Sequence, residues 1–313
     1  MAAYLITGIA GFIGSSLASA LLGRGHAVVG VDDLSAGCGE NVPEGALLIK
    51  ADCCDDALYA SHLPKEPFDA VFHLAGRDDG GTGPDAPLAF LRANTESTLR
   101  LLRFAEENGC SRFIYRSSAS VYGPHPDVPA GETDPPRPTT FSGVSRLAAE
   151  GFVSQYEQRG LRTTILRLFS PYGPDSNASG AEKSLPALFM EMLFRDKHIQ
   201  VNGSPNRCRD FVHVDDVTAA FLACLDRPQS AGQIVNIGGS GKIMVGDLVD
   251  RIAALSEEPV TVEYSGWSDD GEFGRHADIS MAAKYLGYNP EVDLNEGLGR
   301  MYELYKARRA QQK

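Results

Sequence analysis

Two short segments carry residue types whose spacing could support chemistry on a bound nucleotide. Residues 7–14 read TGIAGFIG. Glycines spaced in this way let the backbone approach a pyrophosphate where a helix begins. Further along, Ser118 follows an apolar run, and Ser142 and Arg146 stand four residues apart in SGVSR. On a helix these two side chains would share one face, where a hydroxyl and a fixed positive charge could contact a ligand.

The first segment predicts a dinucleotide site and also the type of dinucleotide. Asp32 closes the apolar run that follows the glycine turn. A carboxylate at this position accepts hydrogen bonds from the adenosine ribose and repels a 2′-phosphate, which favours NAD over NADP. The residues of the turn that we expect to contact the cofactor are Gly8, Gly11, Phe12, Ile13 and Gly14.

The elements that must position these residues alternate along the first half of the chain. Short apolar, β-branched runs predict strands buried on both faces, at residues 4–7, 27–32, 46–50, 70–74, 112–117 and 163–169. Helical periodicity predicts helices at residues 12–24, 87–108 and 142–160, and later at 215–226 and 245–255. This order predicts an α/β protein with a Rossmann-type doubly wound parallel sheet that binds ligands at the carboxyl ends of its strands.

The length predicts one large domain with an appended lobe. We expect residues 1–169, with a contribution from 209–238, to form the NAD-binding Rossmann domain. Residues 170–313 would form mainly a smaller α/β lobe for the substrate. The polar residues 306–313 are expected to be a frayed tail.

Composition excludes several classes of partner. The formal net charge of −12 argues against a nucleic-acid partner, because such binding rests on Lys and Arg neutralising phosphates. The six cysteines show no metal-ligand spacing, so we expect reduced thiols and no metal site. Residues 4–22 lack a basic flank and contain interrupting glycines, and no other apolar stretch is long enough to span a membrane. We therefore expect a cytoplasmic protein with no membrane partner.

Several motifs in order resemble one protein family. They are TGIAGFIG, VGVDDLS, HLAG at 73–76, RSSASVYG at 116–123, SPYGP at 170–174, RDFVHVDDV at 209–217 and ADISMAAKYLGYNP at 277–290. Together they resemble the extended short-chain dehydrogenase/reductases, specifically the NAD-dependent sugar-nucleotide epimerases and dehydratases. The resemblance implies a Rossmann domain and a C-terminal lobe that holds a nucleoside diphosphate sugar.

The resemblance also implies roles for residues near the cofactor. Asp52 would lie beside the adenine, and Leu74, Ala75 and Gly76 would line the cofactor. Asn94 would be the helix asparagine that members of this family place near the active site.

The catalytic residues of the family are only partly present. Its members use a Ser or Thr, a Tyr and a Lys to oxidise a sugar hydroxyl transiently. Ser118 matches the serine, whereas Ser142 falls where the tyrosine belongs and Arg146 where the lysine belongs. Arg146 could still hold the nicotinamide ribose, but serine cannot serve as the base near neutral pH. Loss of a general base commonly costs about 10²–10⁴-fold in rate.

Three interpretations of this change remain open. Another residue could act as the base, and the candidates are Asp78, Asp79 and His125. Alternatively, Ser142 could relay protons through a water in the space that a tyrosine would fill. In the third interpretation the protein is a non-catalytic NAD- and nucleotide-sugar-binding protein.

The substrate end of the family pattern is also altered. Arg209 resembles the arginine that grips the diphosphate, although it could instead pair with Asp210. Arg275 is a second candidate, but the typical arginine falls one position earlier, at Gly274. Ser170 stands where an asparagine is more usual.

The residues after Ser118 favour one activity of the family. Ala119 and Ser120 match the epimerase pattern, whereas dehydratases typically place Asp and Glu there. The resemblance further implies a homodimer formed through the helices at residues 87–108 and 142–160. The sequence thus predicts an NAD-dependent, epimerase-like enzyme with a non-standard base.

Overall fold

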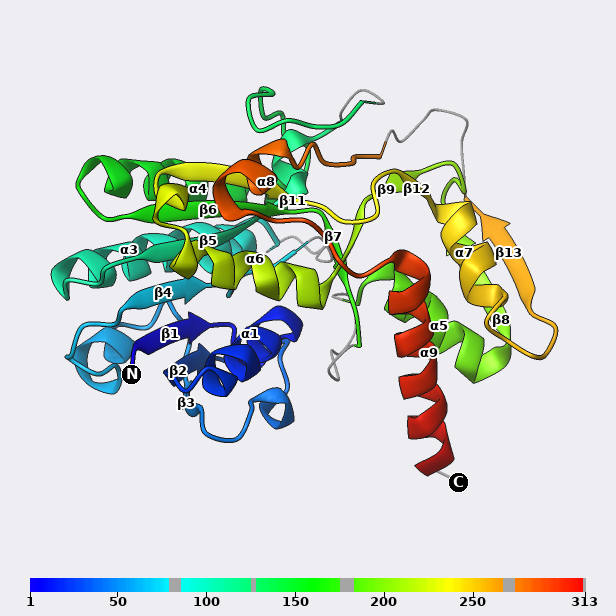
Figure 1. Cartoon of the computed structure of the whole chain (residues 1–313), viewed down its shortest axis with the longest axis horizontal. Coiled ribbons are helices and arrows are strands. Elements are labelled where there is room, and N and C mark those ends of the chain that lie inside the picture. The colour runs from blue at the N-terminus through cyan, green and yellow to red at the C-terminus, as the bar shows by residue number, and fades with distance from the viewer. Residues whose placement is uncertain (79–85, 125–127, 175–182, 267–273, 312–313) are drawn as a thin grey trace.

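A seven-stranded parallel sheet forms the centre of the protein (Figure 1). The structure is a computed structural model that describes residues 1–78, 86–124, 128–174, 183–266 and 274–311. The strand order is β11-β6-β5-β4-β1-β2-β3. The strands are β1 (Ala3–Thr7), β2 (Ala27–Asp32), β3 (Leu47–Lys50), β4 (Ala70–His73), β5 (Phe113–Ser118), β6 (Thr163–Leu168) and β11 (Gln233–Ile237). This sheet confirms the predicted fold class.

Helices cover both faces of the sheet (Figure 1). On one face lie α1 (Phe12–Gly23), α6 (Val214–Asp226) and α8 (Ser280–Leu286), and on the other lie α3 (Ser97–Glu107) and α4 (Phe141–Gln158). Successive residues of one strand pack into the two apolar cores, one on each face of the sheet. Phe113 packs on the α3–α4 side and Ile114 on the α1–α6 side. Apolar residues at consecutive positions are therefore required, as expected for a parallel sheet covered on both faces.

The helix expected over residues 87–108 is interrupted. It comprises α2 (Ala86–Phe90), a π-helical turn η3 (Leu91–Glu96) and then α3. At the junction the Thr98 hydroxyl donates to the Asn94 carbonyl at 2.6 Å, and Ser97 bonds the Ala93 carbonyl in the same way. Such side-chain bonds compete with the regular helical ladder. Wide turns of this kind are frequent at functional sites, and this one carries Asn94.

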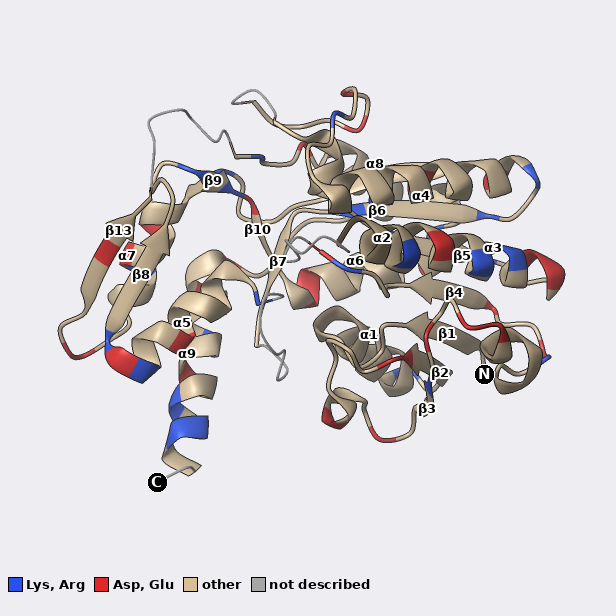
Figure 2. Cartoon of the chain, turned by 180° about the vertical axis from the view of Figure 1, so that it is seen from behind, with Lys and Arg blue, Asp and Glu red and all other residues tan. Residues whose placement is uncertain are grey.

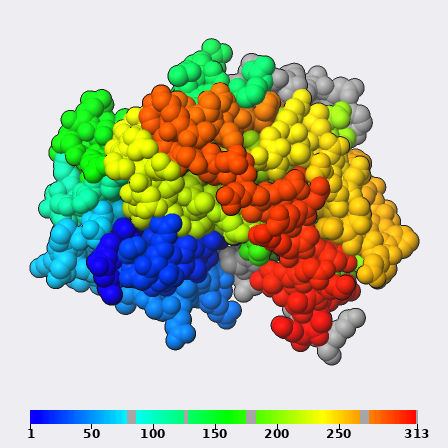
Figure 3. All heavy atoms as spheres, in the orientation of Figure 1, coloured from blue at the N-terminus to red at the C-terminus, as the bar shows by residue number. Residues whose placement is uncertain are grey.

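The C-terminal lobe packs around its own apolar core, beside the Rossmann part (Figure 3). Its helices are α5 (Leu185–Asp196), α7 (Val245–Ala253) and α9 (Leu294–Gln311), and its strands β8 (His198–Asn202) and β13 (Thr261–Ser265) pair in parallel. Two short ladders lie between the parts. They are β7 (Ser170–Tyr172) with β10 (Phe211–His213), and β9 (Cys208–Arg209) with β12 (Ile243–Met244).

The predicted frayed tail at residues 306–313 is wrong as far as residue 311, because α9 continues to Gln311. Tyr302 and Tyr305 pack their rings against Phe194 of α5, at centroid distances of 5.0 and 5.8 Å. Arg309 donates to the Phe194 carbonyl at 2.5 Å. Charged residues occur along α9, as they do along α3 (Figure 2). These contacts with Phe194 hold the end of a helix whose polar composition alone had suggested fraying.

Within the described ranges, none of the helices has the length and apolar character needed to cross a membrane. The same residues contain no grouping of three or more His, Cys, Asp or Glu side chains that could hold a metal ion.

Candidate active site

A cavity of about 630 Å³ opens at the carboxyl ends of the central strands. Its volume is typical of small-molecule sites. It is lined by the residues expected to bind the cofactor: Gly8, Gly11, Phe12, Ile13, Gly14, Asp32, Asp52, Leu74, Ala75 and Gly76. It also contains the candidate substrate residues Ser118, Ser170, Arg209 and Arg275. One cavity therefore joins two groups of residues that lie far apart in the sequence.

The glycine turn lets backbone segments lie closer together than side chains would allow. Gly8 has a φ of +74°, and a Cβ there would lie 2.8 Å from the Ala75 nitrogen. A Cβ at Gly14 would overlap the carbonyl oxygen of Gly8. Helix α1 begins directly after Gly11, so the unpaired amides of its first turn lie at the cavity wall. Such amides suit a pyrophosphate.

Asp32 lies at the end of β2 beside this turn, with 8% of its surface exposed. Its carboxylate accepts hydrogen bonds from the backbone amides of Ala10 and Leu34, both at 2.9 Å. Burial raises the pKa of Asp32, and the two amides oppose the rise. The amides fix the carboxylate at the cavity edge, where a ribose could reach it.

Asp52 lines the same end of the cavity after β3. Its carboxylate accepts from the Cys54 amide at 2.7 Å and forms an ion pair with Arg92 at 2.9 Å. Burial alone would raise the pKa of Asp52, but the Cys54 amide and the Arg92 guanidinium outweigh it and lower the pKa. Asp52 is therefore an anchored anion at the cavity wall.

Ser118 ends β5 at the other end of the cavity. Its hydroxyl oxygen accepts from the Ser120 amide at 3.2 Å. Arg116 precedes it by two positions, so both residues are on the same face of the strand, and both line the cavity. Sequence reasoning missed Arg116. A charged residue in an otherwise apolar strand, in phase with Ser118, was the signal that could have found it.

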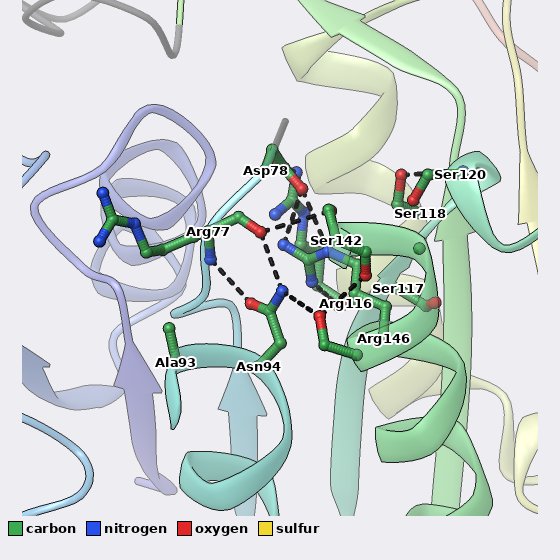
Figure 4. Close-up of polar contacts among 12 residues, drawn as sticks. Arg77, Asp78, Ala93, Asn94, Arg116, Ser117, Ser118, Ser120, Ser142 and Arg146 are labelled. Atoms are coloured by element: carbon green, nitrogen blue, oxygen red, sulfur yellow. Dashed lines mark hydrogen bonds and ion pairs between the residues drawn. The ribbon is translucent and has the colours of Figure 1, made fainter. Parts of the chain in front are cut away.

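Ser142 and Arg146 are not part of the cavity lining among the described residues. Both lie on α4 and are buried, with 1% and 0% of their surfaces exposed. The Ser142 hydroxyl lies 3.5 Å from the Arg77 carbonyl oxygen, at the limit of a hydrogen bond. The chain segment of Arg77 and Asp78 covers these two side chains (Figure 4). The helix thus brings the two residues together, but beneath the cavity wall.

Asp78 lies between two guanidinium groups (Figure 4). Arg146 donates from Nε and Nη2 to its Oδ1, at 3.1 and 2.8 Å, and Arg116 donates to its Oδ2 at 2.5 Å. Arg146 Nη1 also donates to the Arg116 carbonyl at 3.0 Å, which joins the two arginines directly. Burial would raise the pKa of Asp78, but the two guanidinium groups hold it well below its usual range. This candidate base is therefore a firmly ionised carboxylate with little basicity.

Asn94 positions the Asp78 segment from the π-helical turn. Its side-chain oxygen accepts from the Arg77 amide at 2.7 Å, and its side-chain nitrogen donates to the Arg77 carbonyl at 2.9 Å. The same nitrogen donates to Ser145 Oγ at 2.9 Å. Asn94 therefore joins the loop after β4 to helix α4. Of the other candidate bases, Asp79 and His125 lie outside the described residues.

The arginines expected at the substrate end lie in the cavity wall. Arg275 donates to the Ala119 carbonyl at 2.6 Å. A side chain at Gly274, where the resemblance would place the arginine, would overlap the Cys208 carbonyl. The Asp210 carboxylate accepts from three backbone amides, those of Gly239, Gly241 and Ala277. Arg209, the residue before Asp210, donates to the Cys208 carbonyl at 2.9 Å and lines the cavity.

Comparison with known proteins agrees with this geometry. Residues 4–238 match the NAD dependent epimerase/dehydratase family. The chain belongs to this family. It is 32% identical to a UDP-glucose 4-epimerase of Mycolicibacterium smegmatis, over 96% of this chain and 98% of the relative. It is 27% identical to a UDP-glucuronate 4-epimerase of Thermodesulfobacterium geofontis, over 96% of this chain and 95% of the relative.

Solved structures of family members share the whole fold. A UDP-glucose 4-epimerase of Thermotoga maritima, solved with UDP-glucose, has a TM-score of 0.90 at 29% identity, covering 98% of this chain and 99% of that one. MoeE5 in complex with UDP-glucose and NAD has a TM-score of 0.85 at 29% identity, with the same coverage. The glycine turn and the anchored Asp32 fit the NAD dependence of this epimerase/dehydratase family.

Proposed function

We propose that this protein is an NAD-dependent enzyme that modifies a UDP-sugar in the manner of an epimerase. The observation that supports the proposal is the single cavity that joins the glycine turn and Asp32 to Ser118 and the two arginines, Arg209 and Arg275. The glycine turn would hold the pyrophosphate of NAD and Asp32 its adenosine ribose. The two arginines suit the diphosphate of the sugar nucleotide, because guanidinium groups bind such oxygens with paired hydrogen bonds.

The chemistry would take place at the Ser118 end. Bound NAD would supply the acceptor for hydride from the carbon that bears a sugar hydroxyl, whose proton would go to a base. The Ser118 hydroxyl would orient that sugar hydroxyl, while Arg146, paired with Asp78, would hold the loop after β4 beneath the site. The proton acceptor would be a group other than a tyrosine at position 142. Asp78 can accept a hydrogen bond from the sugar, but its two arginines make it a weak base.

The arginine contacts of Asp78 also support a second candidate, a non-catalytic protein that binds NAD and a nucleotide sugar. Product analysis distinguishes the two. The NAD-loaded protein would be incubated with UDP-, dTDP- and GDP-sugars, and the products separated by chromatography. The enzyme proposal predicts conversion of a UDP-sugar. Binding of UDP-sugars without conversion of any member of the panel would leave the binding protein as the function.

We further propose that the protein forms a homodimer through α2, η3, α3 and α4. Large apolar side chains are exposed on these helices: Leu88, Leu91, Leu99, Phe141, Val144 and Phe152. These helices pack against one another, and large exposed apolar patches mark interaction sites. Packing against the same helices of a second copy would bury these side chains.

A further inference from the structure

Two buried polar groups in the cavity wall beside Ser118 have no hydrogen-bond partner within the part of the chain that the structure describes. Arg116 is 11% exposed, and its Nε is buried without an acceptor. The Ser120 hydroxyl is also buried without a partner. Among the described residues, the carboxylate paired with Arg116 is that of Asp78, which is also shared with Arg146. A ligand group that supplies acceptors would complete these contacts, because unmatched buried donors are unfavourable.

Arg116 also has no ligand group assigned to it when other cavity arginines bind the proposed diphosphate. Arg209 and Arg275 are assigned to the diphosphate. The Arg77 side chain is directed away from Asp78 and from the Ser118 end (Figure 4). Arg146 is buried, and its two bonds to Asp78 Oδ1 neutralise it. Of the arginines that line the cavity in the described ranges, Arg116 is therefore the one that lies beside Ser118 with no assigned ligand group.

We propose that the sugar of the bound nucleotide carries a carboxylate and that Arg116 selects for it. This inference rests on the proposed function and names its substrate class, a nucleoside diphosphate uronic acid. A carboxylate offers a guanidinium two oxygens in a matching plane, which a hydroxymethyl group does not. A neutral sugar would leave the donors of Arg116 unmatched.

The contacts of Asp78 would allow a ligand carboxylate to take its place beside Arg116. One hydrogen bond, through Oδ2, joins Asp78 to Arg116, whereas two bonds through Oδ1 join it to Arg146. The Asp78 side chain is 41% exposed, so it can turn toward solvent on one side. The ligand carboxylate would replace Asp78 on Arg116, and Asp78 would keep Arg146. Asp78 thus occupies the anion position until the ligand arrives.

Binding measurements test the proposal with three probes that share one nucleotide: UDP, UDP-glucose and UDP-glucuronate. The two sugars differ only in a hydroxymethyl or a carboxylate group. We expect calorimetry of the NAD-loaded protein to show UDP-glucuronate binding at least tenfold more tightly than UDP-glucose. In Arg116→Gln the preference should vanish while UDP-glucose affinity changes less than threefold. Arg100→Gln, at a surface ion pair of α3 outside the cavity, should keep the full preference.

Equal affinities for the two sugars in the wild-type protein would overturn the inference. An Arg116→Gln variant that weakens both sugars equally would overturn it as well. If that variant does not fold, the salt dependence of the wild-type protein decides, since an ionic contact is screened. The preference should shrink at high salt, and a constant preference counts against an ionic contact. If UDP and both UDP-sugars bind, and the two sugars bind equally well, only the inference about the carboxylate is wrong. If UDP and both UDP-sugars fail to bind, the proposed function is wrong as well.

Discussion

Arg146 on α4 holds the carboxylate of Asp78 with two hydrogen bonds, at 2.8 Å from Nη2 and 3.1 Å from Nε. The arginine is fully buried, and the carboxylate reaches it from the loop after β4. This pair lies at the position where the resemblance predicts a lysine that serves a tyrosine. Here the cation instead anchors a loop at the sugar end of the cavity.

Replacing Asp78 by Asn should destabilise the protein. The change leaves the buried Arg146 without its counter-ion, which in a fully buried pair costs about 3–5 kcal/mol. Because the Asp78 side chain is 41% exposed, we expect a smaller loss of about 1–3 kcal/mol in the free energy of unfolding. Urea denaturation measures it. The matched control is Glu107→Gln, at an exposed ion pair with Arg103, where the change should stay within about 0.5 kcal/mol. Equal effects of the two variants would contradict the account.

Buried His73 predicts a dependence of stability on pH. Its ring lies between the hydroxyls of Thr7 and Thr98, at 2.7 and 2.9 Å. Burial, with help from the charge of Arg146, lowers the pKa of His73 to about 3. The unfolded chain, with a histidine pKa of about 6.5, therefore binds the proton first as the pH falls. The stabilising effect is complete above about pH 6.5 and is lost progressively below it.

Between pH 6.5 and 5 this effect should remove about 2 kcal/mol from the free energy of unfolding. Denaturation at several pH values measures the slope. In His73→Gln the absolute stability falls as well, but this part of the slope should disappear. A slope that is the same in both proteins would show that His73 does not cause it.

Introducing the tyrosine and lysine that the resemblance implies at positions 142 and 146 should not by itself give an active epimerase. Ser142 is 1% exposed and lies against the Arg77 carbonyl, so a phenol at this position needs room. We expect Ser142→Tyr with Arg146→Lys to yield little 4-epimerase activity. Adding Arg116→Ser should raise that activity by at least tenfold over the double variant. The shorter side chain frees space between the cavity and position 146, where Arg116 and Arg146 now share Asp78. Interconversion of UDP-glucose and UDP-galactose is the readout. A double variant as active as the triple variant would refute the steric argument.

The proposed dimer predicts a change in oligomeric state. Val144→Asp with Phe152→Asp places charges on two exposed apolar positions of α4. Light scattering should show a dimer for the wild-type protein and a monomer for the variant, because an unpaired charge is costly within an interface. Leu47→Asp, at an exposed position on edge strand β3, is the control that should stay dimeric. A wild-type monomer would remove this proposal.

The sequence predicted the central sheet and the cofactor end of the cavity because both follow local rules. Apolar runs define buried parallel strands, and the glycine turn lies directly between a strand and a helix. The C-terminal elements were harder to predict. Helix α9 is held by contacts of Tyr302 and Tyr305 with Phe194, which is distant in the sequence.

The prediction of the catalytic end was incomplete for a similar reason. The family resemblance pointed to Ser142 and Arg146, which both lie on α4 as their spacing predicted. The role of Asp78 depends on Arg116 and Arg146, which come from two other elements. A sequence pattern considered one segment at a time does not show that three side chains form one charged cluster. The same limit hid Arg116.

The central claim is that this cavity transfers a hydride between a UDP-sugar and NAD. Single-turnover absorbance at 340 nm tests it most directly, on NAD-loaded protein mixed with UDP-glucuronate or UDP-glucose. We expect a transient rise in absorbance with at least one sugar and a much smaller rise in Ser118→Ala. Saturating binding of both sugars with no absorbance change in the wild-type protein would contradict the claim.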